Sequence, residues 1–225
     1  DHGTSRGLGD VYKRQSDVTR TFPVNGKFTK VQKDVYTEVL NAQELGIKNV
    51  TTKKTMSDIH TSTVSSISQS LVDLGLVPMG VEETISMMHY FEFFMHGTGH
   101  WLGLDVHDAG TTEEKNKPRK LKPGMVTTIE PGIYIRPNKP EIEFKLLEKD
   151  PIKIRERRKS LGMEKATKLE SEEMKDAKSI KHKIPKDLLG IGIRIEDDIV
   201  CTENDPINLT IGAPKTIDDV EAICS

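Results

Sequence analysis

Four polar residues that lie far apart in the sequence stand on or beside apolar segments: Asp17, His100, Glu130 and Glu196. Burying an unpaired carboxylate costs several kcal/mol, so each of them needs a partner. One imidazole with several carboxylates is an oxygen-rich ligand set, which suits Mn²⁺, Co²⁺, Zn²⁺ or Fe²⁺. Because there are more carboxylates than one cation needs, the set indicates two cations. The simpler alternative is that these acids form ordinary salt bridges.

Other polar residues have simpler explanations. Asp197 and Asp198 are predicted to be surface carboxylates, because Asp197 points opposite Glu196 along a strand and Asp198 precedes an apolar Ile-Val pair. His96 could pair with a backbone carbonyl, and Trp101 could either pack in the core or line a pocket. We expect three histidines outside every motif to be surface or packing residues: His60, His89 and His182.

The segments that position these residues can be read from hydrophobic periodicity and turn signals. A strand is expected over 19–24, with a turn at Asn25-Gly26, and a capping box at Thr29 and Gln32 starts a helix that Gly46 closes. A second helix is predicted over 56–74, and strands and turns are expected after Gly80. Two short strands follow within 125–135, one strand covers 192–200, and Thr216 with Asp219 opens a C-terminal helix.

Composition bounds the possible functions. The chain has 225 residues, with 33 basic and 35 acidic side chains, so no strong field indicates nucleic acid or membrane as a partner. Two cysteines do not make a disulfide framework, which favours a cytoplasmic location. Residues 1–15 are interpreted as a non-native or disordered tail, and residues 137–188 as a charged insertion. A nucleic-acid patch at Arg155, Arg157 and Arg158 is the weaker reading of that insertion.

Four motifs in order carry a resemblance: DVTRTFPVNGKFT, FFMHGTGHWLGLDVHDAG, GMVTTIEPGIYI and GIGIRIEDDIV. Together they resemble the metallopeptidase family of Xaa-Pro aminopeptidase (aminopeptidase P), prolidase and methionine aminopeptidase, with aminopeptidase P the best match around His100. The resemblance implies an α+β pita-bread (creatinase/aminopeptidase-like) fold, with a curved mixed sheet and flanking helices. It predicts that residues 16–225 form a partial, incomplete peptidase domain.

The resemblance also implies roles for single residues. Asp17 and Glu196 would bridge two divalent metal ions, with Mn²⁺ the first choice, and His100 and Glu130 would bind one of them. Glu130 would also hold and deprotonate the attacking water, His107 and His96 would contact the substrate and stabilise the tetrahedral intermediate, and Arg194 would orient the active-site carboxylates. The expected substrates are peptides with proline in the second position, and the family allows a homo-oligomer of the full-length protein.

One family ligand is missing from the sequence. An Asp is expected about eleven residues before Asp17, where this chain has Arg6, and neither Asp10 nor Asp1 stands in the expected context. We therefore expect a C-terminal fragment with one weakened metal site and poor or no activity. The alternatives are a prolidase-type Xaa-Pro dipeptidase and a non-catalytic pita-bread binding module.

Overall fold

The computed structural model describes residues 13, 15–115, 117–147 and 151–224, and the chain divides into two compact units. Unit 1 comprises the residues up to Ser66, His96–Ile133 and the residues from Gly192 on. Unit 2 comprises Ile67–Met95 and Tyr134–Ile191. Every residue predicted to do chemistry that the structure describes lies in unit 1. No helix within the described part of the chain is both long and apolar enough to cross a membrane.

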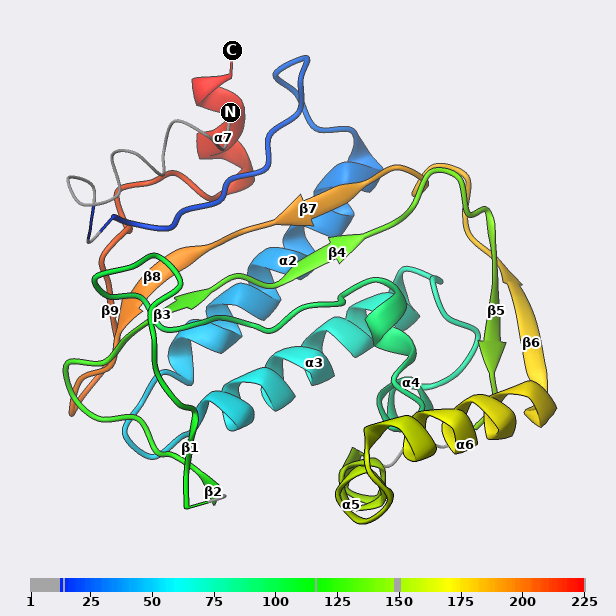
Figure 1. The fold of residues 1–225 in the computed structure, drawn as a ribbon. Helices are drawn as coiled ribbons and strands as arrows, with labels where there is room; N and C mark the ends of the chain where they lie inside the picture. The colour runs from blue at the N-terminus through cyan, green and yellow to red at the C-terminus, as the bar shows by residue number, and fades with distance from the viewer. Residues whose placement is uncertain (1–12, 14, 116, 148–150, 225) are drawn as a thin grey trace. The chain divides into compact units, whose positions relative to one another are not determined.

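The centre of unit 1 is a small sheet in the order β3-β8-β9, which comprises Val126–Ile129, Asp197–Val200 and Ile207–Asn208. β3 and β8 are antiparallel, with Val126 opposite Val200 and Ile129 opposite Asp197. A second pair joins β4 (Gly132–Tyr134) to β7 (Gly192–Arg194). Helix α2 (Lys30–Lys48) packs against β3 and β7 (Figure 1). The end of β3 is followed by Glu130, and the start of β8 is preceded by Glu196, so both residues expected to do chemistry lie at the same end of this strand pair.

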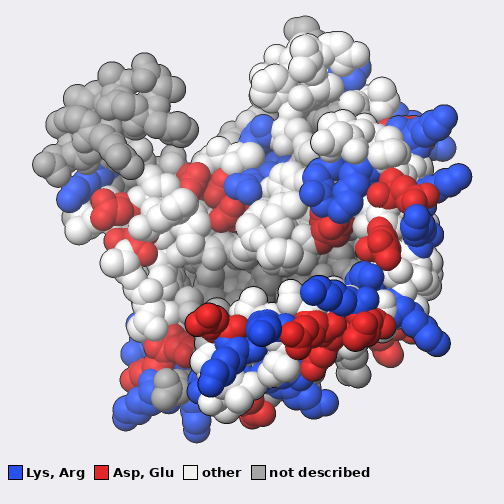
Figure 2. All heavy atoms as spheres, turned by 45° about the vertical axis from the view of Figure 1, so that its right-hand side comes forward, with Lys and Arg blue, Asp and Glu red and all other residues white. Residues whose placement is uncertain are grey.

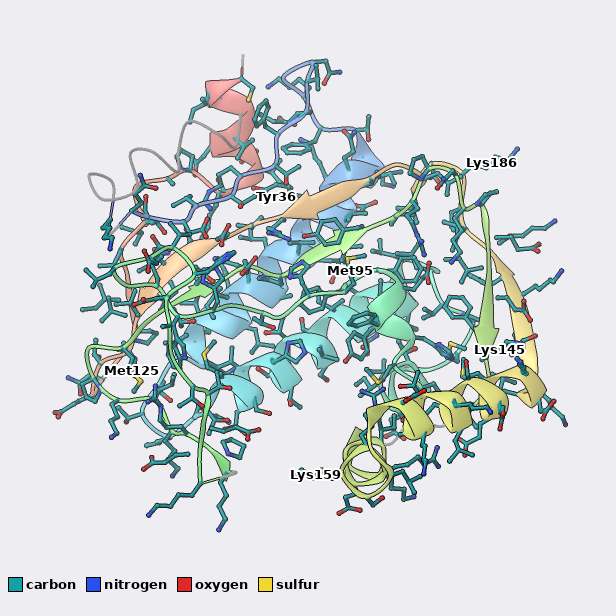
Figure 3. All side chains as sticks on the ribbon, in the orientation of Figure 1. Tyr36, Met95, Met125, Lys145, Lys159 and Lys186 are labelled. Atoms are coloured by element: carbon teal, nitrogen blue, oxygen red, sulfur yellow. The ribbon has the colours of Figure 1, made fainter. Side chains whose placement is uncertain are left out.

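The core of unit 1 comes from helices as well as strands. Tyr36 of α2, labelled in Figure 3, is fully buried, and its hydroxyl donates to Lys215 O at 2.9 Å. Burial raises the pKa of Tyr36 to about 12, so the phenol stays neutral. α3 (Met56–Asp73) contributes Ile59, which joins Val50, Ile129 and Ile199 in one buried cluster. The remaining elements of this unit are the hairpin β1 (Glu113–Glu114) and β2 (Lys117–Pro118), and α7 (Ile217–Ile223).

Local signals predicted several boundaries correctly. The capping box at Thr29 and Gln32 is present at the start of α2, and Gly26 takes a φ of +78° in the predicted turn. The predicted pair of strands within 125–135 corresponds to β3 and β4. Thr216 caps α7 by accepting a hydrogen bond from Asp219 N, as expected.

Three expectations about the backbone were wrong. The strand expected over 19–24 is absent: residues 19–23 run beside residues 194–196 without a regular ladder, and residue 24 lies in a turn. The single strand expected over 192–200 is two strands, β7 and β8, interrupted at Ile195 and Glu196. After Gly80 the chain forms the short helix α4 (Val81–Ser86) and the 3-10 helix η1 (His89–Glu92) rather than strands.

The stretch predicted to be a charged insertion, residues 137–188, falls within unit 2. It holds the antiparallel pair of β5 (Glu141–Lys145) and β6 (Ser179–Lys183), and between these strands in the chain lie the helices α5 (Pro151–Leu161) and α6 (Met163–Asp176). Ile142 and Phe144 of β5 are buried. Basic and acidic side chains are intermixed on the face drawn in Figure 2. The charged stretch is therefore folded into regular elements around a few apolar side chains.

Candidate metal centre

Glu130 and Glu196 come from neighbouring strand ends. Continuing the β3-β8 register by one step places Glu130 opposite Glu196, and one step further the Ile195 N–H donates to Pro131 O at 3.4 Å. Both glutamates are buried, with 9% and 2% of their surface exposed. Antiparallel pairing therefore brings together two carboxylates that are 66 positions apart in the sequence.

His100 is the last residue of the His-Gly-Thr-Gly-His motif and lies alongside β3. The His100 N–H donates to Thr128 Oγ1 at 3.1 Å, and the Thr128 N–H donates to His100 O at 3.0 Å. Gly99 permits this approach, because a Cβ at that position would lie 1.8 Å from Thr128 O. The glycine in the motif is thus required by close backbone packing.

The ring of His100 faces two carboxylates. Its Nδ1 lies 3.1 Å from the carbonyl of Trp101, which can only accept, so Nδ1 carries the proton. Its Nε2 lies 3.4 Å from Asp17 Oδ2 and 3.5 Å from Glu130 Oε1. A lone pair on Nε2 facing two carboxylate oxygens needs a second proton or a cation between them.

The structure brings all four predicted ligands together. Ligand atoms of His100, Glu130 and Glu196 lie within 4.8 Å of one another, and so do those of Asp17, His100 and His107. Burial and the carboxylates of Glu130 and Asp17 raise the pKa of Glu196 to about 7, against a hydrogen bond from the Thr19 hydroxyl. Such an excess of negative charge around one imidazole fits a divalent cation.

Three further predicted residues surround this cluster. Arg194 Nη1 lies 3.1 Å from Glu130 Oε2, and Nη2 lies 3.2 Å from His96 Nε2. His96 Nδ1 lies 2.8 Å from Gly97 O, so Nδ1 donates and Nε2 accepts from Arg194. Burial, with Arg194 beside the ring, lowers the pKa of His96. The exposed ring of His107 packs edge-on against His100, with centroids 4.3 Å apart.

The expectation that Asp197 and Asp198 lie on the surface was wrong. Both are buried, with 0% and 2% of their surface exposed. Burial alone would raise the pKa of Asp197, but hydrogen bonds from Arg20, Thr210 and Gln43 outweigh it and lower that pKa. Asp198 accepts the Asp17 N–H at 3.1 Å, and burial raises its pKa. Strand alternation failed here because the side chain of Asp197 faces polar partners rather than solvent.

Residues that the motifs did not single out also support the cluster. Arg20 and Thr19 hold the segment of Asp17 against Glu196, and His60 Nδ1 lies 2.9 Å from Thr98 Oγ1. One signal was available in the sequence, because Asp17 and Thr19 are two positions apart in an extended segment and share a side. Nothing local indicated Arg20 or His60.

Trp101, His89 and His182 have packing roles. Trp101 packs against the core cluster, with the Arg119 guanidinium 5.4 Å from its ring centroid. His89 is buried edge-on against Phe144, and His182 Nε2 lies 2.8 Å from Gly75 O.

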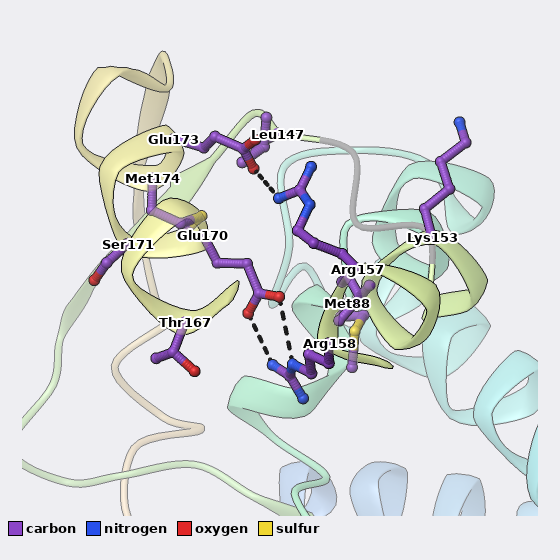
Figure 4. A pocket seen from close by; sticks show the side chains of 11 residues that line it. Met88, Leu147, Lys153, Arg157, Arg158, Thr167, Glu170, Ser171, Glu173 and Met174 are labelled. Atoms are coloured by element: carbon purple, nitrogen blue, oxygen red, sulfur yellow. Dashed lines mark hydrogen bonds and ion pairs between the residues drawn. The ribbon is translucent and has the colours of Figure 1, made fainter. Parts of the chain in front are cut away.

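A cavity of about 440 Å³ lies in unit 2 and is crossed by the ion pairs Arg157–Glu173 and Arg158–Glu170 (Figure 4). None of the predicted site residues lines it. The side chain of Arg155 lies outside the described residues.

Comparison with solved structures defines the class of fold. Aminopeptidase PepP of Pseudomonas aeruginosa aligns with a TM-score of 0.71 and 36% identity, over 93% of this chain and 38% of that one. Escherichia coli aminopeptidase P with the inhibitor Pro-Leu aligns with a TM-score of 0.69 and 35% identity, over 92% and 37%. The expected fold is confirmed: it is the pita-bread fold of these aminopeptidases.

The sequence comparisons identify the family. The chain belongs to metallopeptidase family M24, whose model matches residues 8–203. Xaa-Pro aminopeptidase of Escherichia coli K12 is 36% identical over 207 residues, and human Xaa-Pro aminopeptidase 3 is 33% identical over 210. These matches cover 92% and 93% of this chain but 37% and 32% of the relatives. The chain therefore spans about a third of their length.

Proposed function

We propose that the protein containing this chain is a metal-dependent aminopeptidase that releases the N-terminal residue from peptides with proline in the second position. The observation that carries this proposal is the convergence of Asp17, His100, Glu130 and Glu196 in unit 1. The family and the names of the similar proteins agree with it. In this proposal the four residues hold two divalent cations, with Mn²⁺ the first choice.

Divalent cations at this position supply Lewis acidity, which lowers the pKa of water and polarises a peptide carbonyl. Glu130 accepts the proton of the attacking water and returns it to the leaving amine. Its Oε2 is held by Arg194 at 3.1 Å, which leaves Oε1 on the side of His100. Arg194 thereby orients the carboxylate rather than taking part in proton transfer.

His107 and His96 act on the substrate oxygen in this proposal, each as a hydrogen-bond donor to the developing negative charge. His107 is exposed and close to the cluster. Both ring nitrogens of His96 are engaged, one with Gly97 O and one with Arg194. His96 must therefore release one of these partners before it can donate to a substrate.

Metal titration tests the site directly. Calorimetric titration of Mn²⁺ into the chain should show binding, and His100→Ala should abolish it because the only nitrogen ligand proposed is lost. His182→Ala is the matched control, since that imidazole lies in unit 2 and contacts Gly75 O. Equal Mn²⁺ binding by His100→Ala and the parent chain would refute the proposal.

Substrate length separates the two enzymatic alternatives. An Xaa-Pro aminopeptidase should cleave a tripeptide with proline second, whereas a prolidase-type dipeptidase should cleave only the dipeptide. Mn²⁺ binding without hydrolysis of either peptide by a protein of the relatives' full length would favour a non-catalytic binding module.

We also propose that this chain is itself poorly active. Arg6 stands where the family pattern places a further Asp ligand, and a cation that lacks that carboxylate binds more weakly. This position lies outside the described residues. Hydrolysis of an Xaa-Pro peptide by this chain at the rate of an intact relative would contradict this part of the proposal.

A further inference from the structure

The segment that carries Asp17 has no helix or strand to hold it. Residues 15–23 form neither, although they run beside Glu196. Its backbone contacts with that side include the Glu196 N–H donating to Thr19 O at 3.1 Å and the Asp17 N–H donating to the Asp198 carboxylate at 3.1 Å. Because so few backbone hydrogen bonds hold this segment, side chains must fix the position of Asp17.

Arg20 provides such a restraint. Its side chain is 15% exposed, and all five N–H donors of its guanidinium are used. They reach five oxygens from three segments of unit 1: Thr19 O at 2.9 Å, Glu196 O at 2.6 Å, Asp197 Oδ1 at 2.6 Å, Ala213 O at 3.0 Å and Pro214 O at 2.8 Å. One planar cation thus joins the Asp17 segment, the Glu196 segment and the loop before α7.

Asp197 completes the arrangement from the other side. Its carboxylate is fully buried and is bonded by Arg20 and by Lys215 Nζ at 3.2 Å. Neutral donors occupy its remaining acceptor sites: Gln43 Nε2 at 2.8 Å, Asn208 Nδ2 at 3.0 Å and Thr210 Oγ1 at 2.8 Å. A buried carboxylate with this many partners is held in one orientation, and it holds Arg20 in turn.

We infer that Arg20 and Asp197 form a clasp that sets the distance between Asp17 and Glu196 and so adapts both carboxylates to a pair of cations. This inference rests on the proposed function. Arg20 binds the carbonyl of Thr19, which is two residues from Asp17, and the carbonyl of Glu196 itself. Arg20 and Asp197 are therefore positioning residues, since neither needs to touch metal or substrate.

A clasp that only stabilises the fold would behave differently from one that positions ligands. Loss of a purely structural ion pair lowers the melting temperature without changing the affinity of the remaining folded protein for a cation. Loss of a positioning contact weakens Mn²⁺ binding in protein that is still folded. Supporting contacts around metal ligands are typically worth 10- to 100-fold in affinity.

The experiment compares Mn²⁺ affinity with melting temperature for the parent chain and three variants. Arg20→Lys keeps the charge but cannot span five acceptors, Asp197→Asn keeps the shape but loses the charge, and Lys215→Met removes the outer cation of the clasp. Glu221→Gln is the matched control, because Glu221 is a buried carboxylate that accepts the Phe28 N–H and bonds Lys33, away from the four ligands. Circular dichroism restricts the comparison to folded variants.

We expect Arg20→Lys and Asp197→Asn to weaken Mn²⁺ binding at least tenfold, Lys215→Met to weaken it less, and Glu221→Gln to bind as the parent does. Folded Arg20→Lys and Asp197→Asn variants with parental affinity would overturn the inference. Should both fail to fold, Lys215→Met decides: an affinity loss beyond that of Glu221→Gln supports the clasp, and parental affinity refutes it. A parent chain that binds no Mn²⁺ would overturn the proposed function itself, and this inference with it.

Discussion

Units 1 and 2 use charged residues in opposite ways. In unit 1, Asp197 and Glu196 are almost completely buried, and each side chain has named partners. In unit 2, the pairs Arg157–Glu173 and Arg158–Glu170 join α5 to α6 at the surface, where 19% to 45% of each side chain is exposed. Water and salt weaken the exposed pairs, whereas a buried charge that loses its partner cannot be solvated. Replacing one of these buried acids in unit 1 should therefore change the free energy of unfolding far more than replacing a member of the exposed pairs in unit 2.

The largest effect is expected from removing the fully buried carboxylate of Asp197. Asp197→Ala should destabilise the chain by about 3 to 5 kcal/mol, because Arg20 and Lys215 would remain partly buried without the carboxylate that pairs with them. Urea unfolding followed by circular dichroism measures the change. A loss below about 1 kcal/mol would mean that solvent reaches this site, and the contrast between the units would fail.

A steric test sharpens the contrast from the side of packing. Gly99→Ala should cost about 3 kcal/mol, since its Cβ would meet Thr128 O at 1.8 Å and force the His100 segment away from β3. Gly97→Ala is the matched control within the same motif, because the nearest atom to its Cβ would be 3.7 Å away. Thermal unfolding of the two variants gives the comparison, and equal midpoints would contradict it.

A pH titration tests the electrostatic strain in unit 1. The pKa of Glu196 is raised to about 7 in the folded protein, so between its unfolded value and 7 the folded state binds the proton more tightly. The stability contributed by that proton is complete below the unfolded pKa and is lost as the pH rises through about 7. The metal-free chain should therefore lose on the order of 2 kcal/mol from this group between pH 5 and 8.

The control for that titration is Glu196→Gln, which should flatten the pH dependence over the same range. Saturating Mn²⁺ should also flatten it, because a cation among these carboxylates replaces the proton. A metal-free parent whose stability is unchanged or rises between pH 5 and 8 would contradict the raised pKa.

The smallest effect is expected in unit 2. Arg158→Ala removes an exposed partner of Glu170 and should leave the thermal midpoint unchanged within error. Glu173→Gln, which weakens the neighbouring pair, should behave in the same way. A clear drop in the midpoint for either variant would show that these ion pairs hold α5 against α6.

The sequence predicted those features that depend on neighbouring residues. The Thr29 capping box, the Asn25-Gly26 turn and the end of α3 before Gly75 are set by interactions within a few positions, and all three occur in the structure. The motifs likewise predicted which side chains would lie near His100. These predictions succeeded because a local pattern leaves the chain few alternative conformations.

The surroundings of the site could not be predicted in the same way. Arg20 and Asp197 are 177 positions apart, so nothing near Asp197 in the sequence indicates that a cation will neutralise it. Alternation therefore placed Asp197 on the surface, and the strand-forming residues Thr19, Thr21, Phe22 and Val24 placed a strand at residues 19–24. Both errors have one cause, because side chains rather than a ladder hold the Asp17 segment.

The register of β3 against β8 has a consequence for how this protein can vary. Glu130 and Glu196 are held opposite each other by strand pairing, so their separation does not depend on the length of the chain between them. Segments of this excursion that lie in unit 2, such as α5 and α6, can therefore gain or lose residues without moving either acid. Evolution is thus free to remodel this excursion while the two glutamates stay in place.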